Sequence, residues 1–301
     1  MPPTAAAVLP HPPLLVSALA GAAAPELEPL RHACRLALEA VLAAAGTIIL
    51  IGDGPVWGVP QAGAPGSFRP YGADLEVVLP APLDLDLTGL PEPARLADLP
   101  LSLAVAAYLL AELDTPPASL LAATAPASLG PRAAATIGHH LAATAQGPGA
   151  TAGTPTLGAD RPVGVGGDGP VGVGGDGPVG VGGVGPVGLG GVGPVGVGGD
   201  GAVGLVAMGD LSACRTDRAP GGFRPEAAAF DASVAAAFRT GAPDRLLDLD
   251  PGQATDLLAG GRVPLQVLAG ALQDAPAMCG QVLYEDAPYG VGYLVALLTT
   301  S

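Results

Sequence analysis

The stretch TIILIGDG at residues 47–54 decides the fold that this sequence predicts. Its first residues are β-branched or aliphatic, which is typical of a strand buried on both faces of a sheet. The Gly-Asp-Gly turn that follows places the carboxylate of Asp53 directly after this strand. A helical pattern precedes the strand and ends at Gly46, a residue suited to a helix C-terminus. The apolar stripe of this helix consists of Leu30, Cys34, Leu38, Val41 and Leu42.

The same alternation of short apolar runs and longer helical patterns extends over the rest of the chain. It predicts an α/β domain of three layers, with a central sheet and helices on both faces. In such folds ligands gather at the carboxyl ends of the strands, so the loops that follow three of the strands, with His11, Asp53 and residues 209–212, are predicted to share one cleft. Further strands are predicted at 5–9, 75–79 and 202–208, and further helices at 101–113, 131–145, 225–240 and 253–273, the last broken near Gly260 and Gly261.

A Gly-rich octapeptide array interrupts this pattern at residues 161–200. Its period of eight is neither the three of collagen nor the nine of calcium-binding β-rolls. Long surface insertions cost little loop-closure entropy, so a folded domain can tolerate one. We therefore predict that 1–145 and 201–301 form one α/β domain and that 146–200 is a disordered low-complexity insertion.

The charge balance argues against several classes of partner. Twelve basic residues, all Arg, stand against 27 acidic ones, which gives a net charge of −15. Such a chain repels nucleic acid and anionic membrane surfaces, so we expect neither as a partner. The absence of Lys excludes a P-loop lysine and a Schiff-base lysine.

The cysteines and the N-terminal residues predict a cytoplasmic protein. Cys34, Cys214 and Cys279 are few, odd in number and irregularly spaced, which fits a reducing compartment better than a disulfide framework. The apolar N-terminal stretch has no basic region before it and is interrupted by prolines at positions 10, 12 and 13. These features do not fit a signal peptide.

Three segments carry a resemblance to a known enzyme family: LPHPPLL at 9–15, MGDLSACR at 208–215 and YEDAPYGVGY at 284–293. Together they resemble the class III extradiol ring-cleavage dioxygenases, in the divergent actinobacterial form of their B-type chain. The resemblance covers nearly the whole sequence apart from the insertion. It implies the three-layer α/β fold and a non-haem iron(II) centre that opens catechol-type rings with O₂.

The resemblance also implies which residues would hold Fe²⁺. His11 matches the first histidine ligand, in the loop after the opening strand. Asp53 stands where the family has its second histidine, and Glu285, or its neighbour Asp286, matches the carboxylate ligand. Non-haem iron(II) oxygenases use two histidines and one carboxylate and leave coordination positions open. A site of His11, Asp53 and Glu285 is more anionic than that pattern.

The family's acid-base histidine follows an Asp-x-Ser step, and here that position is Ala213. No other residue is identified as a catalytic acid or base, although such groups typically contribute about 10²–10⁴ in rate. We therefore expect a catalytically degenerate, dioxygenase-like protein, a possible pseudoenzyme. The alternative is a non-catalytic binding or assembly subunit that reuses the fold.

Each of these residues also has an ordinary structural interpretation. His11 suits a loop histidine between prolines, Asp53 suits a Gly-Asp-Gly turn, and Glu285 suits a turn or cap. Arg215 and Tyr289 are predicted to bind a small aromatic or acidic molecule, Arg215 through a paired hydrogen bond to a carboxylate. Tyr289 equally suits a packing residue with a solvated hydroxyl.

Overall fold

The computed structural model describes residues 2–80, 87–145 and 202–300 of the chain. The octapeptide array and the insertion predicted at 146–200 lie outside the described residues. The described residues on both sides of that gap contribute strands to the same sheet. None of the helices in these described ranges is long and apolar enough to cross a membrane.

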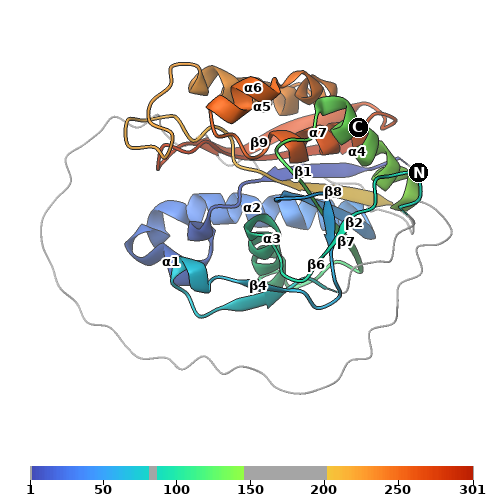
Figure 1. Ribbon diagram of the computed structural model, residues 1–301, viewed down its shortest axis with the longest axis horizontal. Helices are drawn as coiled ribbons and strands as arrows, with labels where there is room; N and C mark the ends of the chain where they lie inside the picture. The colour runs from blue at the N-terminus through green and yellow to red at the C-terminus, as the bar shows by residue number, and fades with distance from the viewer. Residues whose placement is uncertain (1, 81–86, 146–201, 301) are drawn as a thin grey trace, which may run out of the picture. The chain divides into compact units, whose positions relative to one another are not determined.

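An eight-stranded mixed sheet forms the centre of the fold (Figure 1). From one edge to the other its strands are β6 (Ala94–Leu96), β3 (Gly58–Pro60), β7 (Ser119–Ala125), β2 (Thr47–Asp53), β8 (Val203–Met208), β1 (Ala5–Leu9), β10 (Tyr293–Thr300) and β9 (Met278–Asp286). Strands β7, β2, β8 and β1 are parallel neighbours. Strand β10 runs antiparallel to β1, and β9 runs antiparallel to β10.

Helices cover both faces of this sheet. Figure 1 shows α1 (Ser17–Ala20), α2 (Ala24–Ala44) and α3 (Leu101–Ala111) below the sheet, and α4 (Pro131–Ala145), α5 (Ala227–Arg239), α6 (Pro251–Asp256) and α7 (Arg262–Ala271) above it. Short 3₁₀ helices lie at Pro13–Leu15, Gly21–Ala23, Arg69–Tyr71 and Pro243–Asp248. The structure thus confirms the predicted α/β fold with helices on both faces.

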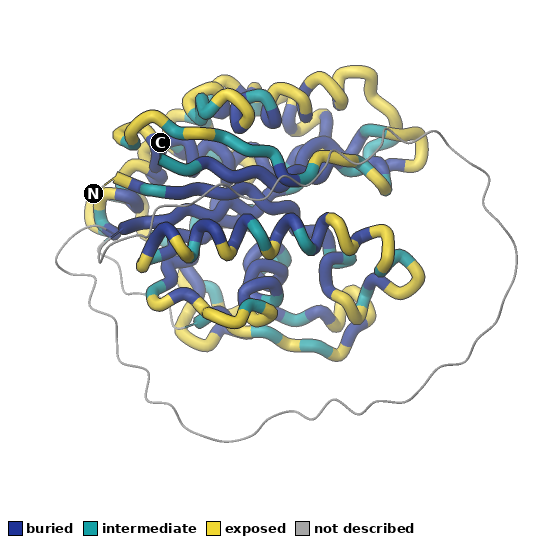
Figure 2. The backbone as a smooth tube through the Cα atoms, turned by 180° about the vertical axis from the view of Figure 1, so that it is seen from behind, coloured by how far each residue is buried: buried dark blue, intermediate teal, exposed yellow. Residues whose placement is uncertain are grey.

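Strand β2 shows why the sequence predicts this fold so directly. Ile48 and Leu50 belong to the core shared with α2 and α3, whereas Ile49 and Ile51 belong to the core shared with α4, α5 and α7. Side chains alternate between the two faces of a strand, so a strand buried on both faces must be apolar throughout. Figure 2 shows the buried residues concentrated in the sheet and on the helix faces that contact it.

Some strands differ from the sequence prediction. The run at 75–79 forms β5 (Glu76–Val78), which pairs only with β4 (Pro65–Ser67) in a separate two-stranded sheet. Strands β7, β9 and β10 were not predicted. Strand β7 is Ala-rich, and β9 is an edge strand with irregular burial, so neither shows the periodicity that identifies strands.

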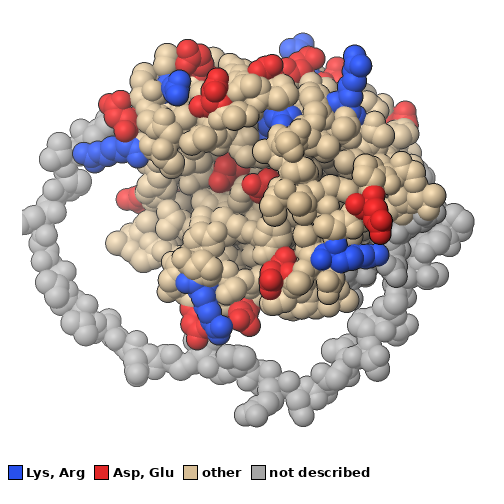
Figure 3. Space-filling model, in the orientation of Figure 1, with Lys and Arg blue, Asp and Glu red and all other residues tan. Residues whose placement is uncertain are grey.

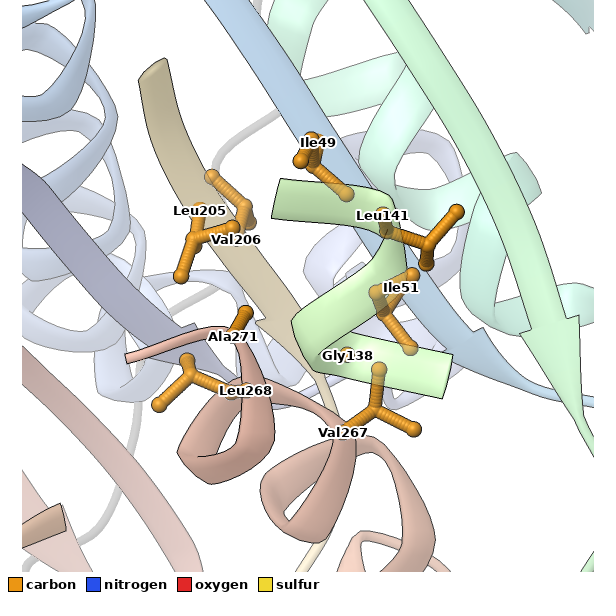
Figure 4. Close-up of a pocket in the computed structure, with 9 residues that line it drawn as sticks. All are labelled: Ile49, Ile51, Gly138, Leu141, Leu205, Val206, Val267, Leu268 and Ala271. Carbon is orange, nitrogen blue, oxygen red and sulfur yellow. The ribbon is translucent and has the colours of Figure 1, made fainter. Parts of the chain in front are cut away.

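Helices α4 and α7 approach each other through glycines. A side chain at Gly138 would collide with the backbone of Val267, and one at Gly270 would collide with the backbone of Ala135. A small apolar cavity of about 10 Å³ lies beside this contact, between the helices and strands β2 and β8 (Figure 4). Its lining offers no polar partner that could hold a water molecule, so it stays dry.

Candidate functional site

Three loops at the carboxyl ends of neighbouring strands build the candidate site. His11 follows β1, Asp53 ends β2, and Asp210 follows β8, the strand between them. Because these strands are parallel, their carboxyl ends meet at one edge of the sheet. The sequence predicted that the three loops would share a cleft, and the structure places the imidazole of His11 next to both Asp53 and Asp210.

The imidazole of His11 lies between the two carboxylates. Its Nε2 is 3.3 Å from Oδ1 of Asp53, and its Nδ1 is 3.9 Å from Oδ1 of Asp210. The backbone N–H of His11 donates a hydrogen bond of 2.8 Å to the same Asp210 oxygen. The side chains of His11, Asp210 and Asp53 are 9%, 22% and 37% exposed, so Asp53 is the most accessible of the three.

A buried arginine fixes the loop that carries His11. The guanidinium of Arg31, on α2, donates hydrogen bonds to the carbonyl oxygens of Leu14, Leu15 and Ala24. A guanidinium presents several donors in a rigid plane, which suits it to bind several backbone carbonyls at once. Arg31 thereby holds the turn after His11 against helix α2.

A buried carboxylate fixes the loop that carries Asp210. Asp231, on α5, accepts hydrogen bonds from the backbone N–H and the hydroxyl of Ser212 and from the guanidinium of Arg215. Burial raises the pKa of Asp231, and the hydrogen bonds from Ser212 and Arg215 oppose that shift. Asp231 was not predicted from the sequence. A charged residue beside Phe230, on the apolar face of a predicted helix, is the signal that could have identified it.

The turn between α6 and α7 forms a wall of the site. The backbone N–H of Gly261 donates to the carbonyl of Asp210 at 2.8 Å, and a side chain at Gly209 or Gly261 would collide with the other residue's backbone. A Cβ at Gly260 would lie 3.4 Å from Oδ2 of Asp53. The turn therefore lies against the backbone of Gly209 and Asp210, and its Gly260 lies next to the carboxylate of Asp53.

Burial and the neighbouring carboxylates determine the protonation behaviour around the site. Burial raises the pKa of Asp210, nearby His11 lowers it, and the charge of Asp53 adds to the increase. Burial raises the pKa of the Tyr293 hydroxyl, and the charge of Asp210 raises it further. Burial, followed by the charge of Asp286, raises the pKa of Tyr284 to about 12. These tyrosine hydroxyls therefore stay protonated at neutral pH.

Other predicted site residues have different partners. Glu285 lies on β9, two strands from β1, and forms an ion pair with Arg239 of α5. The carboxylate of Asp286 accepts the backbone N–H of Ala287 at 2.7 Å, as in a turn. The Tyr289 hydroxyl donates to Glu26 at 3.1 Å. Ala213 is buried, and the guanidinium of Arg215 donates a hydrogen bond to the buried carboxylate of Asp231.

The site brings together two of the three iron ligands that the resemblance implies, His11 and Asp53. An imidazole binds a metal ion through one of its nitrogens, and the carboxylates of Asp53 and Asp210 lie at opposite nitrogens of His11. One ion at His11 can therefore share only one of these carboxylates. Within the described ranges, no group of three or more His, Cys, Asp or Glu side chains is arranged to hold a metal ion. These residues do not fit a three-residue iron centre.

Comparison with known proteins supports the fold. The chain matches no protein-family model, and no curated protein matches its sequence. It is similar to the crystal structure of the uncharacterized protein JW3007 from Escherichia coli K12, with a TM-score of 0.50 and 14% sequence identity. The match covers 98% of this chain and 99% of that chain. At this identity the similarity shows a shared fold and leaves the activity to be argued from the site.

Proposed function

We propose that this protein is a catalytically degenerate member of the class III extradiol dioxygenase-like fold and that its site binds a small molecule without opening a ring. The observation that carries the proposal is the placement of Asp53 and Asp210 at opposite nitrogens of His11. Iron(II) oxygenases of this kind need three protein ligands on one ion. Here the third implied ligand, Glu285, is engaged by Arg239.

The position of the acid-base group supports the same proposal. Ring cleavage needs a residue that moves the proton of the substrate hydroxyl, and Ala213 has only a methyl group there. The backbone around Ala213 is nevertheless held in place by its neighbours. Its backbone N–H donates to the carbonyl of Leu257 at 2.8 Å, and Cys214 beside it is fully buried. The loop is thus preorganised without the side chain that the chemistry needs.

Preorganised loops are what a binding site needs. Arg31 and Asp231 hold the loops of His11 and Asp210 from two different helices, so ordering these loops costs little when a ligand binds. The rigid carboxyl edge of the sheet supplies the base of the site.

One observation favours ring cleavage as a second candidate. The 3.3 Å between Nε2 of His11 and Oδ1 of Asp53 is short enough for one ion to contact both atoms. A bound iron ion would offer coordination positions for a catecholate and for O₂. His11 and Asp53 are the residues that would hold it.

Anaerobic iron(II) titration by calorimetry, followed by oxygen uptake with catechol, tests the proposal. The intact protein is compared with His11→Ala and with the control His32→Ala, a histidine of α2 outside the site. We expect no saturable iron binding that depends on His11 and no catechol-dependent oxygen consumption. One-site iron binding that is lost only in His11→Ala, together with catechol-dependent oxygen consumption, would overturn the proposal in favour of the dioxygenase.

A further inference from the structure

Two glycines flank Asp53, and the close approach of other side chains requires both of them. Neither Gly52 nor Gly54 has a positive φ, the conformation for which a turn would need glycine. A Cβ at Gly52 would collide with Oγ of Ser102. A Cβ at Gly54 would lie 2.8 Å from Cβ of Thr124. Each glycine therefore makes room for a side chain that carries a hydroxyl group.

Both hydroxyl groups hold the backbone around Asp53. Ser102, in the first turn of α3, donates a hydrogen bond of 2.7 Å to the carbonyl oxygen of Asp53. Thr124, on β7, donates to the carbonyl oxygen of Val56 at 3.0 Å and lies 3.4 Å from that of Gly58. The side chains of Ser102 and Thr124 are buried, so water does not compete for these hydrogen bonds. The end of β2 and the loop after it are thus attached to α3 and β7.

This attachment on one face of β2 directs the carboxylate of Asp53 to the other face. Side chains alternate along a strand, and Gly52 faces α3. Asp53 points the opposite way, where its Oδ1 lies 3.3 Å from Nε2 of His11. No arginine of the described ranges forms an ion pair with Asp53. Figure 3 shows acidic side chains in the centre of one face, with the basic side chains of that face standing apart from one another. The position of the Asp53 carboxylate therefore depends on its backbone.

We infer that Ser102 and Thr124 are positioning residues of the candidate site, because their hydroxyl groups keep the Asp53 carboxylate beside His11. This inference rests on the proposed binding function, and it assigns Asp53 to the site rather than to an ordinary turn. The side chain of Asp53 is 37% exposed, so without an anchored backbone it would be free to turn into the solvent. A binding group that is already held in place loses less entropy when a ligand binds.

NMR spectroscopy of the metal-free protein, labelled with ¹⁵N-histidine, tests the inference at one neutral pH. The signals of His11 are those that disappear in His11→Ala. Asp53→Asn should move the Nε2 signal of His11, because a neighbouring carboxylate influences how the proton is shared between the two ring nitrogens. Ser102→Ala and Thr124→Val should each move this signal in the same direction by at least half of that change. The signals of the other histidines should stay in place.

Two controls separate positioning from a purely structural role. Thr124→Ser keeps the hydroxyl group, so the His11 signal should remain as in the original protein. Ser233→Ala, on α5, also removes a hydroxyl that donates to a backbone carbonyl at 2.7 Å, and it should leave the His11 signal unchanged. Chemical denaturation of each variant measures its stability independently of this signal.

The inference is overturned if the His11 signal stays in place in Asp53→Asn, or if it moves there but not in Ser102→Ala and Thr124→Val. A change in only one of the two hydroxyl variants would overturn the assignment of the other residue. Because Ser102 and Thr124 belong to different elements, a variant that fails to fold leaves the other to decide. Iron titration and oxygen uptake test the proposed function separately, since the NMR experiment uses no metal and no ligand.

Discussion

The loops around His11 and the interface between α4 and α7 are ordered by opposite means. Around His11, buried charged side chains from distant helices, Arg31 and Asp231, hold irregular backbone by hydrogen bonds. Between α4 and α7, glycines let two regular helices approach until backbone meets backbone, beside an apolar cavity. The polar network positions the loops of His11 and Asp210, whereas the glycine contact contributes only packing. Changes in the first region should therefore alter binding and stability together, and changes in the second should alter stability alone.

The largest effect is expected at the helix interface. Gly138→Val places a branched side chain against the backbone of Val267, which cannot move without separating α4 from α7. Overpacking in a tight core typically costs about 1–3 kcal/mol and occasionally more, and we expect the upper end or beyond here because the obstacle is backbone. Chemical denaturation measures the loss in the free energy of unfolding.

The matched control for that change is Gly130→Ala. A Cβ at Gly130, just before α4, meets no atom within 4 Å. The free energy of unfolding of Gly130→Ala should stay within about 0.5 kcal/mol of that of the original protein, as for other surface substitutions. A Gly138→Val protein as stable as this control would show that the helices are not in contact there.

A smaller loss is expected at the polar network. Asp231→Ala leaves the Ser212 N–H and hydroxyl and the Arg215 guanidinium without their acceptor. Breaking a fully buried ion pair costs about 3–5 kcal/mol, but Arg215 is partly exposed and water can solvate it, so we expect about 2–3 kcal/mol. Chemical denaturation of Asp231→Ala measures the loss in the free energy of unfolding. Asp274→Ala, which changes an exposed aspartate paired with His139, is the control.

Asp231→Ala should also weaken ligand binding, because the loop of Asp210 loses its anchor. Gly138→Val, measured under conditions in which the variant remains folded, should not weaken ligand binding. If both variants weakened ligand binding equally, the contrast between the two regions would be wrong.

The smallest effect concerns the pH dependence of stability. The raised pKa of Asp210 means that its protonated form is favoured in the folded protein. Its stabilising contribution is therefore complete below the unfolded pKa and is lost as pH rises through the folded pKa. Asp210→Asn stays neutral, so its stability relative to the original should rise between pH 3 and pH 7. Unfolding curves at the two pH values measure the free energy of unfolding of both proteins. A difference between them that does not change with pH would show that the pKa of Asp210 is not raised.

The sequence predicted the central sheet better than its edge. The buried parallel strands β1, β2 and β8 and the main helices follow from apolar periodicity, whereas the parallel strand β7 was missed because it is Ala-rich. Strands β9 and β10 were missed because an antiparallel edge is defined by pairing across a turn, and the pattern of β9 is irregular. The candidate site shows the same division. His11 and Asp53 were identified from their positions after strands, whereas Asp231 and Arg31 reach the site from distant helices.

By itself, the sequence determined that alternating strands and helices form an α/β domain, and that His11, Asp53 and the 209–212 loop lie at the same edge. Parallel strands leave no other arrangement for their carboxyl ends. Only the tertiary structure decided that the two carboxylates lie at opposite nitrogens of the imidazole and that Glu285 pairs with Arg239. Side-chain direction in a loop depends on the groups that hold its backbone. In this protein those groups come from helices far away in the sequence.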